Sequence, residues 1–116
     1  MNPIEIITKR ITEERLRAFL GKPFAEMIKF VADVDRGVIA LGGEMHSNAE
    51  IILLENGSLQ KDLWGGNVYP NAKEGERIEY ASLINVRPSQ GNPALEVQNV
   101  AIKEKMEKIT KNLLPI

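Results

Sequence analysis

The sequence predicts an α+β fold: a mostly antiparallel sheet of four or five strands, with a short N-terminal helix and a C-terminal amphipathic helix packed on one side. Two observations support it. Short β-prone runs are separated by glycine-containing turns at hairpin spacing, and each of the two helical segments has a single apolar stripe, as a helix covering a sheet should. With 116 residues and 43% hydrophobic content, the chain is expected to form a single domain over residues 1–116.

Both helices are marked by capping residues. Thr12 is a candidate N-cap before two acidic residues, which predicts a helix over 13–20 that ends before Gly21. Asn99 is a candidate N-cap for a helix over about 100–113. Its apolar residues recur at spacings of four, three and four: Ile102, Met106, Ile109 and Leu113.

The first strands are predicted at 4–8 and 27–34, and the second of these forms a hairpin with residues 38–43 through a turn at 35–37. A helix over 23–33 is the competing interpretation. A strand is preferred because alternate residues are apolar: Ile28, Phe30, Ala32 and Val34.

A second hairpin is predicted at Asn56-Gly57, a dipeptide that suits a type I′ turn, between the strand IILLE and a segment ending WGGNVY. A further strand is predicted over 77–87. On that strand Asn85 and Arg87 would share one face.

Composition excludes several classes of function. Fifteen basic and sixteen acidic residues give a net charge of -1, so we expect neither nucleic acid nor a membrane as a partner. No window approaches the roughly 18 apolar residues of a spanning helix, and the N-terminus does not resemble a signal peptide. There is no cysteine, and the cytoplasm is the expected location.

His46 and Glu44 are the candidate catalytic residues. In an extended backbone they would point the same way, and a carboxylate beside an imidazole can orient a general base. The competing interpretation is a solvated loop histidine, which is the commoner case. A metal site is less well supported, because further ligands would have to come from distant acids such as Glu50 or Asp62.

The stretch LINVRPSQGN supplies the candidate ligand-binding corner. Arg87 offers a planar fork for carboxylate or phosphate, and its polar neighbours could build an anion-binding turn around Gly91. The side chains concerned are Asn85, Arg87, Ser89, Gln90 and Asn92. Alternatively, Arg87 forms a structural ion pair and the other residues cap a turn.

Trp64 is the only tryptophan and precedes two glycines. It could stack on a planar ligand or anchor a partner, but a core aromatic on a strand that bends at Gly65-Gly66 is favoured. The chain has no nucleophile elbow, dinucleotide fingerprint or phosphate loop, so no cofactor can be named.

The order of three motifs, GGExH, LWG and INxRPSQGN, resembles a family of small uncharacterised prokaryotic proteins with a domain of unknown function. The resemblance runs from about Val31 to Leu113. In that family pattern an acid often follows the histidine by two positions, where this chain has Asn48. The resemblance therefore implies one carboxylate fewer for a metal or proton relay, and it implies no activity.

Two functions are consistent with these features. The favoured one is a ligand-binding or assembly module, expected to be a homodimer, with an anionic small molecule at the Arg87 corner. The alternative is a small hydrolase or transferase acting on an anionic molecule, in which His46 and Glu44 transfer a proton. The enzyme requires His46 and Arg87 to share a cleft.

Overall fold

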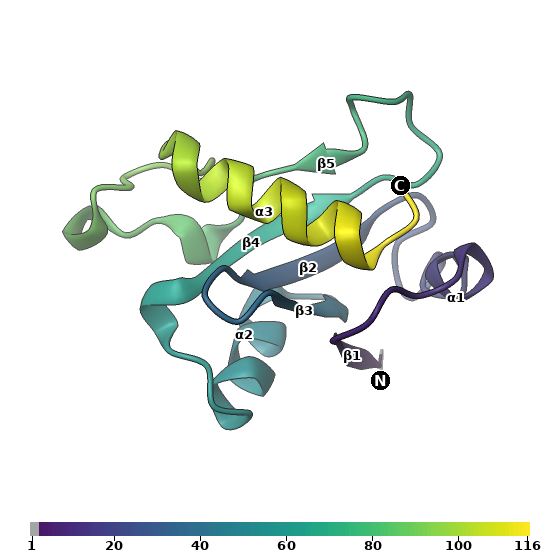
Figure 1. The fold of residues 1–116 in the computed structure, drawn as a ribbon, viewed down its shortest axis with the longest axis horizontal. Coiled ribbons are helices and arrows are strands. Elements are labelled where there is room, and N and C mark those ends of the chain that lie inside the picture. Colours follow the sequence, from purple (N-terminus) through teal and green to yellow (C-terminus); the bar gives the residue numbers. More distant parts are fainter. Residues whose placement is uncertain (1–2) are drawn as a thin grey trace.

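The computed structural model describes residues 3–116 and contains a five-stranded antiparallel sheet in the order β1-β3-β2-β4-β5 (Figure 1). The strands are β1 (Ile4–Ile7), β2 (Ile28–Asp33), β3 (Val38–Gly42), β4 (Leu63–Val68) and β5 (Ile78–Glu79). The α-helices are α1 (Glu13–Arg17), α2 (His46–Glu55) and α3 (Val100–Leu113). Short 3-10 turns are η1 (Gln60–Asp62), η2 (Leu83–Asn85) and η3 (Pro88–Gln90). This confirms the predicted fold class.

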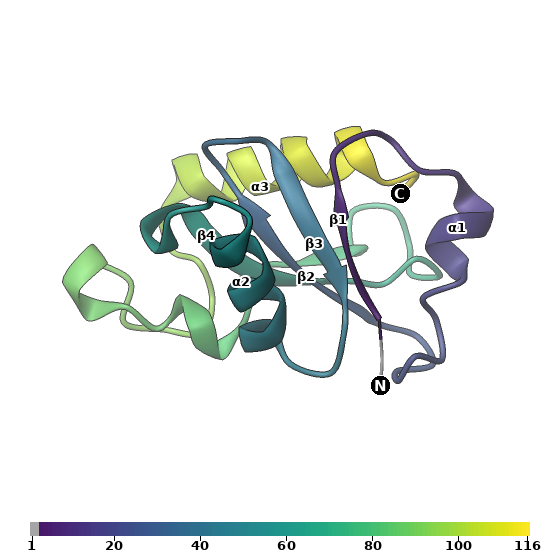
Figure 2. The same cartoon turned by 90° about the horizontal axis from the view of Figure 1, so that it is seen from below.

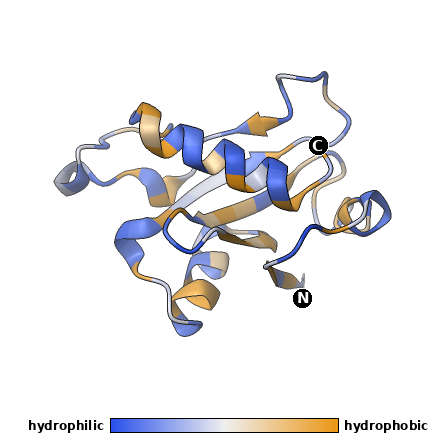
Figure 3. Ribbon diagram, viewed as in Figure 1, coloured by the Kyte–Doolittle hydropathy of each residue, from blue (hydrophilic) through white to orange (hydrophobic). Residues whose placement is uncertain are grey.

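The sheet separates two apolar layers, with α3 on one face and α2 on the other (Figures 1 and 2). On the α3 side, the core joins residues of α1 and α3 to the sheet, among them Leu16, Phe30, Trp64, Met106 and Leu113. On the α2 side, the core is smaller and contains Val31, Val38, Ala40, Ala49, Leu53 and Leu63. In Figure 3, β2 and β3 are largely hydrophobic, whereas most of α3 is hydrophilic. The two predicted helices therefore share one side of the sheet, as expected.

The helix caps and the first hairpin are also confirmed. The side chains of Thr12 and Asn99 accept hydrogen bonds from the first turns of α1 and α3. Residues 28–33 of the predicted strand 27–34 form β2 rather than a helix, and the turn after β2 contains Gly37 at a φ of 71°. Helix α1 ends at Arg17, three residues earlier than predicted, because residues 18–20 continue as a turn.

The second predicted hairpin is wrong, because IILLE belongs to α2. Gly57 has a φ of 98° and lies just after the helix, where its N–H bonds to the Leu54 carbonyl at 3.2 Å. Asn-Gly therefore ends a helix here instead of turning a hairpin, since both structures need a residue at positive φ. Four consecutive apolar residues, 51–54, cannot distinguish a buried strand from a helix by periodicity.

The predicted strand over 77–87 is also wrong beyond β5. Ala81 bridges Glu96, and the Ser82 hydroxyl accepts a hydrogen bond from the Ile84 N–H as the chain enters η2. Asn85 and Arg87 nevertheless converge, because both hydrogen-bond to carbonyls of β4. Over residues 3–116, no helix has the length and apolar character needed to cross a membrane.

Candidate functional site

Asn85 completes the hydrogen bonding of β4 where no strand is available. Strand β4 pairs with β2 along its length, but β5 reaches only Asn67 and Val68. The Asn85 side chain accepts from the Gly65 N–H at 2.8 Å and donates to the Gly65 carbonyl at 2.9 Å. Asn85 is fully buried. Its amide therefore replaces one residue of a neighbouring strand.

Arg87 has a similar role at the start of β4. It is 7% exposed, and its guanidinium group donates to the carbonyls of Ile84, Gln60 and Leu63 and to the Gln90 side chain. The guanidinium carbon lies 4.2 Å from the centroid of the Trp64 ring. Burial lowers the pKa of Arg87. Most of its donors are therefore already engaged within the protein.

The rest of LINVRPSQGN supports this arrangement. The Asn92 amide donates to the carbonyls of Asn85, Ala94 and Glu96, and Gly91 has the positive φ, 77°, expected of the turn. Ser89 is exposed. Anion binding at this corner stays a prediction, and few of the Arg87 donors are left to support it.

Trp64 lies in the core on the α3 side and is 2% exposed. Its ring therefore offers no free face to a ligand or partner, in agreement with the favoured interpretation. The following glycines allow close packing: a Cβ on Gly65 would lie 2.6 Å from the Ser82 Cβ, and one on Gly66 would lie 2.6 Å from the Phe30 ring.

His46 is the first residue of α2 and is 8% exposed. Its Nε2 lies 2.7 Å from the Gly66 carbonyl oxygen, which can only accept, so Nε2 carries the proton and Nδ1 is the acceptor of the neutral ring. Burial lowers the pKa of His46, and Lys29 lowers it further. The Gly66 hydrogen bond, Asn67 and Glu79 oppose that shift.

Helix α2 begins at His46, and Met45 before it is extended, so the predicted pairing of Glu44 with His46 stays a prediction. Glu44 is exposed and precedes the helix, and the Gly66 carbonyl orients the imidazole. Within residues 3–116, no three or more His, Cys, Asp or Glu side chains are grouped to hold a metal ion. Glu50 instead lies near Arg87; burial raises the Glu50 pKa, and the arginine charge partly offsets this.

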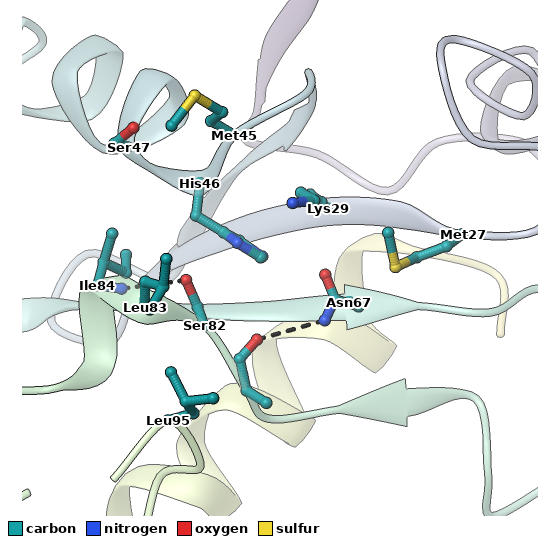
Figure 4. A pocket seen from close by; sticks show the side chains of 11 residues that line it. Met27, Lys29, Met45, His46, Ser47, Asn67, Ser82, Leu83, Ile84 and Leu95 are labelled. Atoms are coloured by element: carbon teal, nitrogen blue, oxygen red, sulfur yellow. Dashed lines mark hydrogen bonds between the residues drawn. The ribbon is translucent and has the colours of Figure 1, made fainter. Parts of the chain in front are cut away.

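A cavity of about 530 Å³ opens beside His46, between the start of α2, strands β2 and β4, and the segment 81–84 (Figure 4). Its lining residues are Met27, Lys29, Met45, His46, Ser47, Asn67, Ala81, Ser82, Leu83, Ile84 and Leu95. Neither Arg87 nor Trp64 is among them. His46 and the Arg87 corner therefore do not share this cavity, which the one-site enzyme would require.

Asn67 provides the cavity with an unsatisfied acceptor. It is 7% exposed, and its amide nitrogen donates to Glu79 at 2.8 Å and to the Ala81 carbonyl at 3.3 Å. Its Oδ1 is buried and makes no hydrogen bond of good geometry, although the side chain lies close enough to the His46 ring to raise the pKa of His46. In Figure 4 this oxygen points into the space near His46 and Lys29. Among the described residues, Glu50 Oε2 and Trp64 Nε1 are also buried without a partner, but neither residue lines the cavity.

Sequence reasoning found His46 but missed Lys29, Asn67 and Ser82. Lys29 and Asn67 can be recognised in the sequence as polar residues inside otherwise apolar strands. Their convergence on His46 could not be predicted, because it depends on the pairing of β2 with β4 and on α2, of which residues 51–55 were expected to form a strand.

The fold and the cavity together define an α+β domain with one antiparallel sheet and a pocket next to its second helix. The chain belongs to a family of proteins of unknown function, DUF5674, whose sequence model matches residues 5–113. This confirms the resemblance to a domain of unknown function. No curated protein and no solved structure matches the chain.

Proposed function

We propose that this protein is a binding module whose small-molecule ligand occupies the cavity beside His46. The volume, about 530 Å³, lies within the roughly 300–1,000 Å³ range of small-molecule sites. The lining also has the usual composition of such sites, a mostly apolar wall with a few polar groups.

The unpaired Oδ1 of Asn67 carries this proposal. Leaving a buried acceptor unsatisfied costs roughly 1–3 kcal/mol. A ligand that donates a hydrogen bond to this oxygen would recover much of that free energy. The anion site predicted around Arg87 has less support, since its donors already bind carbonyls and Gln90.

A fragment screen followed by ¹H–¹⁵N NMR tests this function. We expect apolar fragments to shift the amide signals around His46, Asn67 and Ser82. Leu83→Asp should abolish these shifts by placing a charge at the apolar mouth. Leu59→Asp is the matched control, because Leu59 is also exposed but does not line the cavity. A screen in which no fragment shifts the cavity signals would overturn the proposal.

A second candidate function is the small hydrolase or transferase predicted from His46 and Glu44. The observation that favours it is a histidine with a lowered pKa in one cavity with the hydroxyls of Ser47 and Ser82. We expect such an enzyme to turn over activated esters or phosphate esters, and His46→Gln to abolish turnover. Equal rates for wild type and His46→Gln would exclude it.

A further inference from the structure

We propose that the cavity selects an apolar organic acid that also carries an N–H or O–H group. This inference rests on the proposed binding function and names the class of ligand. Each part of that class follows from a different part of the lining.

The body of the ligand should be apolar, because apolar residues dominate the wall. Three of them are largely exposed: Met45 at 55%, Leu83 at 79% and Leu95 at 50%. Exposed apolar side chains that gather at one opening are typical of a binding site. Met27 and Met45 also have flexible side chains that adapt to a ligand's shape.

The ligand should contribute a hydrogen-bond donor, because the Asn67 Oδ1 and the Nδ1 of the neutral His46 ring are acceptors. Asn67 Oδ1 makes no hydrogen bond of good geometry. The Nε2–H of His46 is engaged by Gly66, and Nδ1 accepts when the ring is neutral. A carbonyl or ether oxygen in the ligand would meet these groups unfavourably, whereas an N–H or O–H group would pair with them.

The ligand should carry a negative charge, because Lys29 is the one charged residue in the lining. The ion pairs found within residues 3–116 do not include Lys29. Its ammonium nitrogen lies 5.3 Å from the centroid of the Phe24 ring. A single ammonium matches a singly charged carboxylate better than a phosphate dianion, which is usually held by several donors.

Three related probes separate these contributions: indole-3-acetate, its methyl ester, and 1-methylindole-3-acetate. The ester removes the charge and the 1-methyl compound removes the N–H, while both keep the apolar ring. Dissociation constants are measured by NMR titration of the cavity signals. We expect indole-3-acetate to bind about 5-fold more tightly than the ester and roughly 3- to 10-fold more tightly than the 1-methyl compound.

Variants of Lys29 then assign the charge preference. Lys29→Gln should remove the preference for the acid over the ester, and Lys29→Arg should retain most of it. Lys73→Gln is the matched control, because Lys73 is an exposed lysine outside the cavity lining. Because the probe comparison uses the unaltered protein, it does not depend on how well a variant folds.

The outcomes separate the inference from the function on which it rests. Equal affinity for the acid and the ester, or for the N–H and N-methyl compounds, overturns the proposed ligand class while cavity binding stands. The same holds if other fragments occupy the cavity and none of the three probes does. If no compound of any kind shifts the cavity signals, the binding function fails and the inference fails with it.

Discussion

At the scale of single residues, buried polar side chains take over hydrogen bonds that the backbone leaves open. Asn85 pairs with both backbone groups of Gly65, Arg87 binds the Leu63 carbonyl, and Asn92 binds three carbonyls of the surrounding loop. Because unpaired backbone groups are costly when buried, these residues stabilise the edge of β4. Their side-chain types suit carbonyl binding as well as they suit ligand binding.

We expect Asn85→Leu to lower the free energy of unfolding by roughly 2–4 kcal/mol, because the buried N–H and C=O of Gly65 would lose their partner. Urea unfolding measures this change. Asn48→Leu, at an exposed position of α2, should change stability by no more than about 0.5 kcal/mol. A loss as small as that at Asn85 would contradict the role in strand completion.

His46 should make stability dependent on pH. Burial gives it a lower pKa in the folded state, so below its ordinary pKa of about 6.5 the unfolded chain binds the proton more readily. The free energy of unfolding should therefore fall as the pH drops below about 6.5, and this contribution should level off below the folded pKa. Two charged neighbours act on the folded-state pKa of His46, at which this contribution levels off. Lys29 lowers that pKa and Glu79 raises it.

The dependence is checked by urea unfolding between pH 7 and pH 5 and by NMR titration of the single histidine. His46→Gln keeps an N–H donor for the Gly66 carbonyl and does not titrate, so its stability should lack this component. A measured His46 pKa above about 6.5 would refute the prediction.

At the scale of elements, the glycine pair in β4 sets how closely the neighbouring segments approach. A Cβ on Gly65 would lie 2.6 Å from the Cβ of Ser82 and 3.2 Å from Cδ2 of His46. Distances this short require a segment to move. The glycine therefore positions both the segment 81–84 and the start of α2 around the cavity.

We expect Gly65→Ala to destabilise the protein by about 1–3 kcal/mol and to shift the cavity signals in NMR spectra. Ser82→Gly removes the two nearest atoms that a Cβ at position 65 would meet, so the double variant should lose less stability than the two single losses added together. A double-mutant cycle by urea unfolding measures this coupling. Strictly additive losses would mean that the two positions do not limit each other.

Elements with clear caps and periodic apolar residues could be predicted from the sequence. Helix α3 shows both, and β2 shows the alternation of a strand. Helix α2 could not be recognised, because its apolar residues continue around the helix and its terminal Asn56-Gly57 also suits a hairpin.

At the scale of the whole molecule, the two faces of the sheet are covered unequally. Helix α3 presents its apolar stripe to the larger core, whereas α2 leaves Ile51 52% exposed and Leu54 38% exposed. Exposed apolar residues on one helix are typical of a contact with a partner. The predicted homodimer remains a proposal. Ile51 and Leu54 are the residues at which to test it, because Trp64 is buried.

We expect sedimentation to show a dimer that Ile51→Lys dissociates, because a charge would enter the apolar contact. Val100→Lys is the control, since Val100 is 67% exposed at the start of α3, on the opposite face of the sheet. A monomer at all concentrations, or equal behaviour of the two variants, would exclude self-association through α2.

The sequence by itself determined the fold class, both terminal helices and the first hairpin, because these depend on local caps, turns and periodicity. Only the tertiary structure decided the rest. It buried Arg87 and Asn85 as partners for β4, and it brought Lys29 and Asn67 beside His46. The reason is physical: strand pairing joins residues far apart along the chain, and burial determines which polar groups remain free to bind.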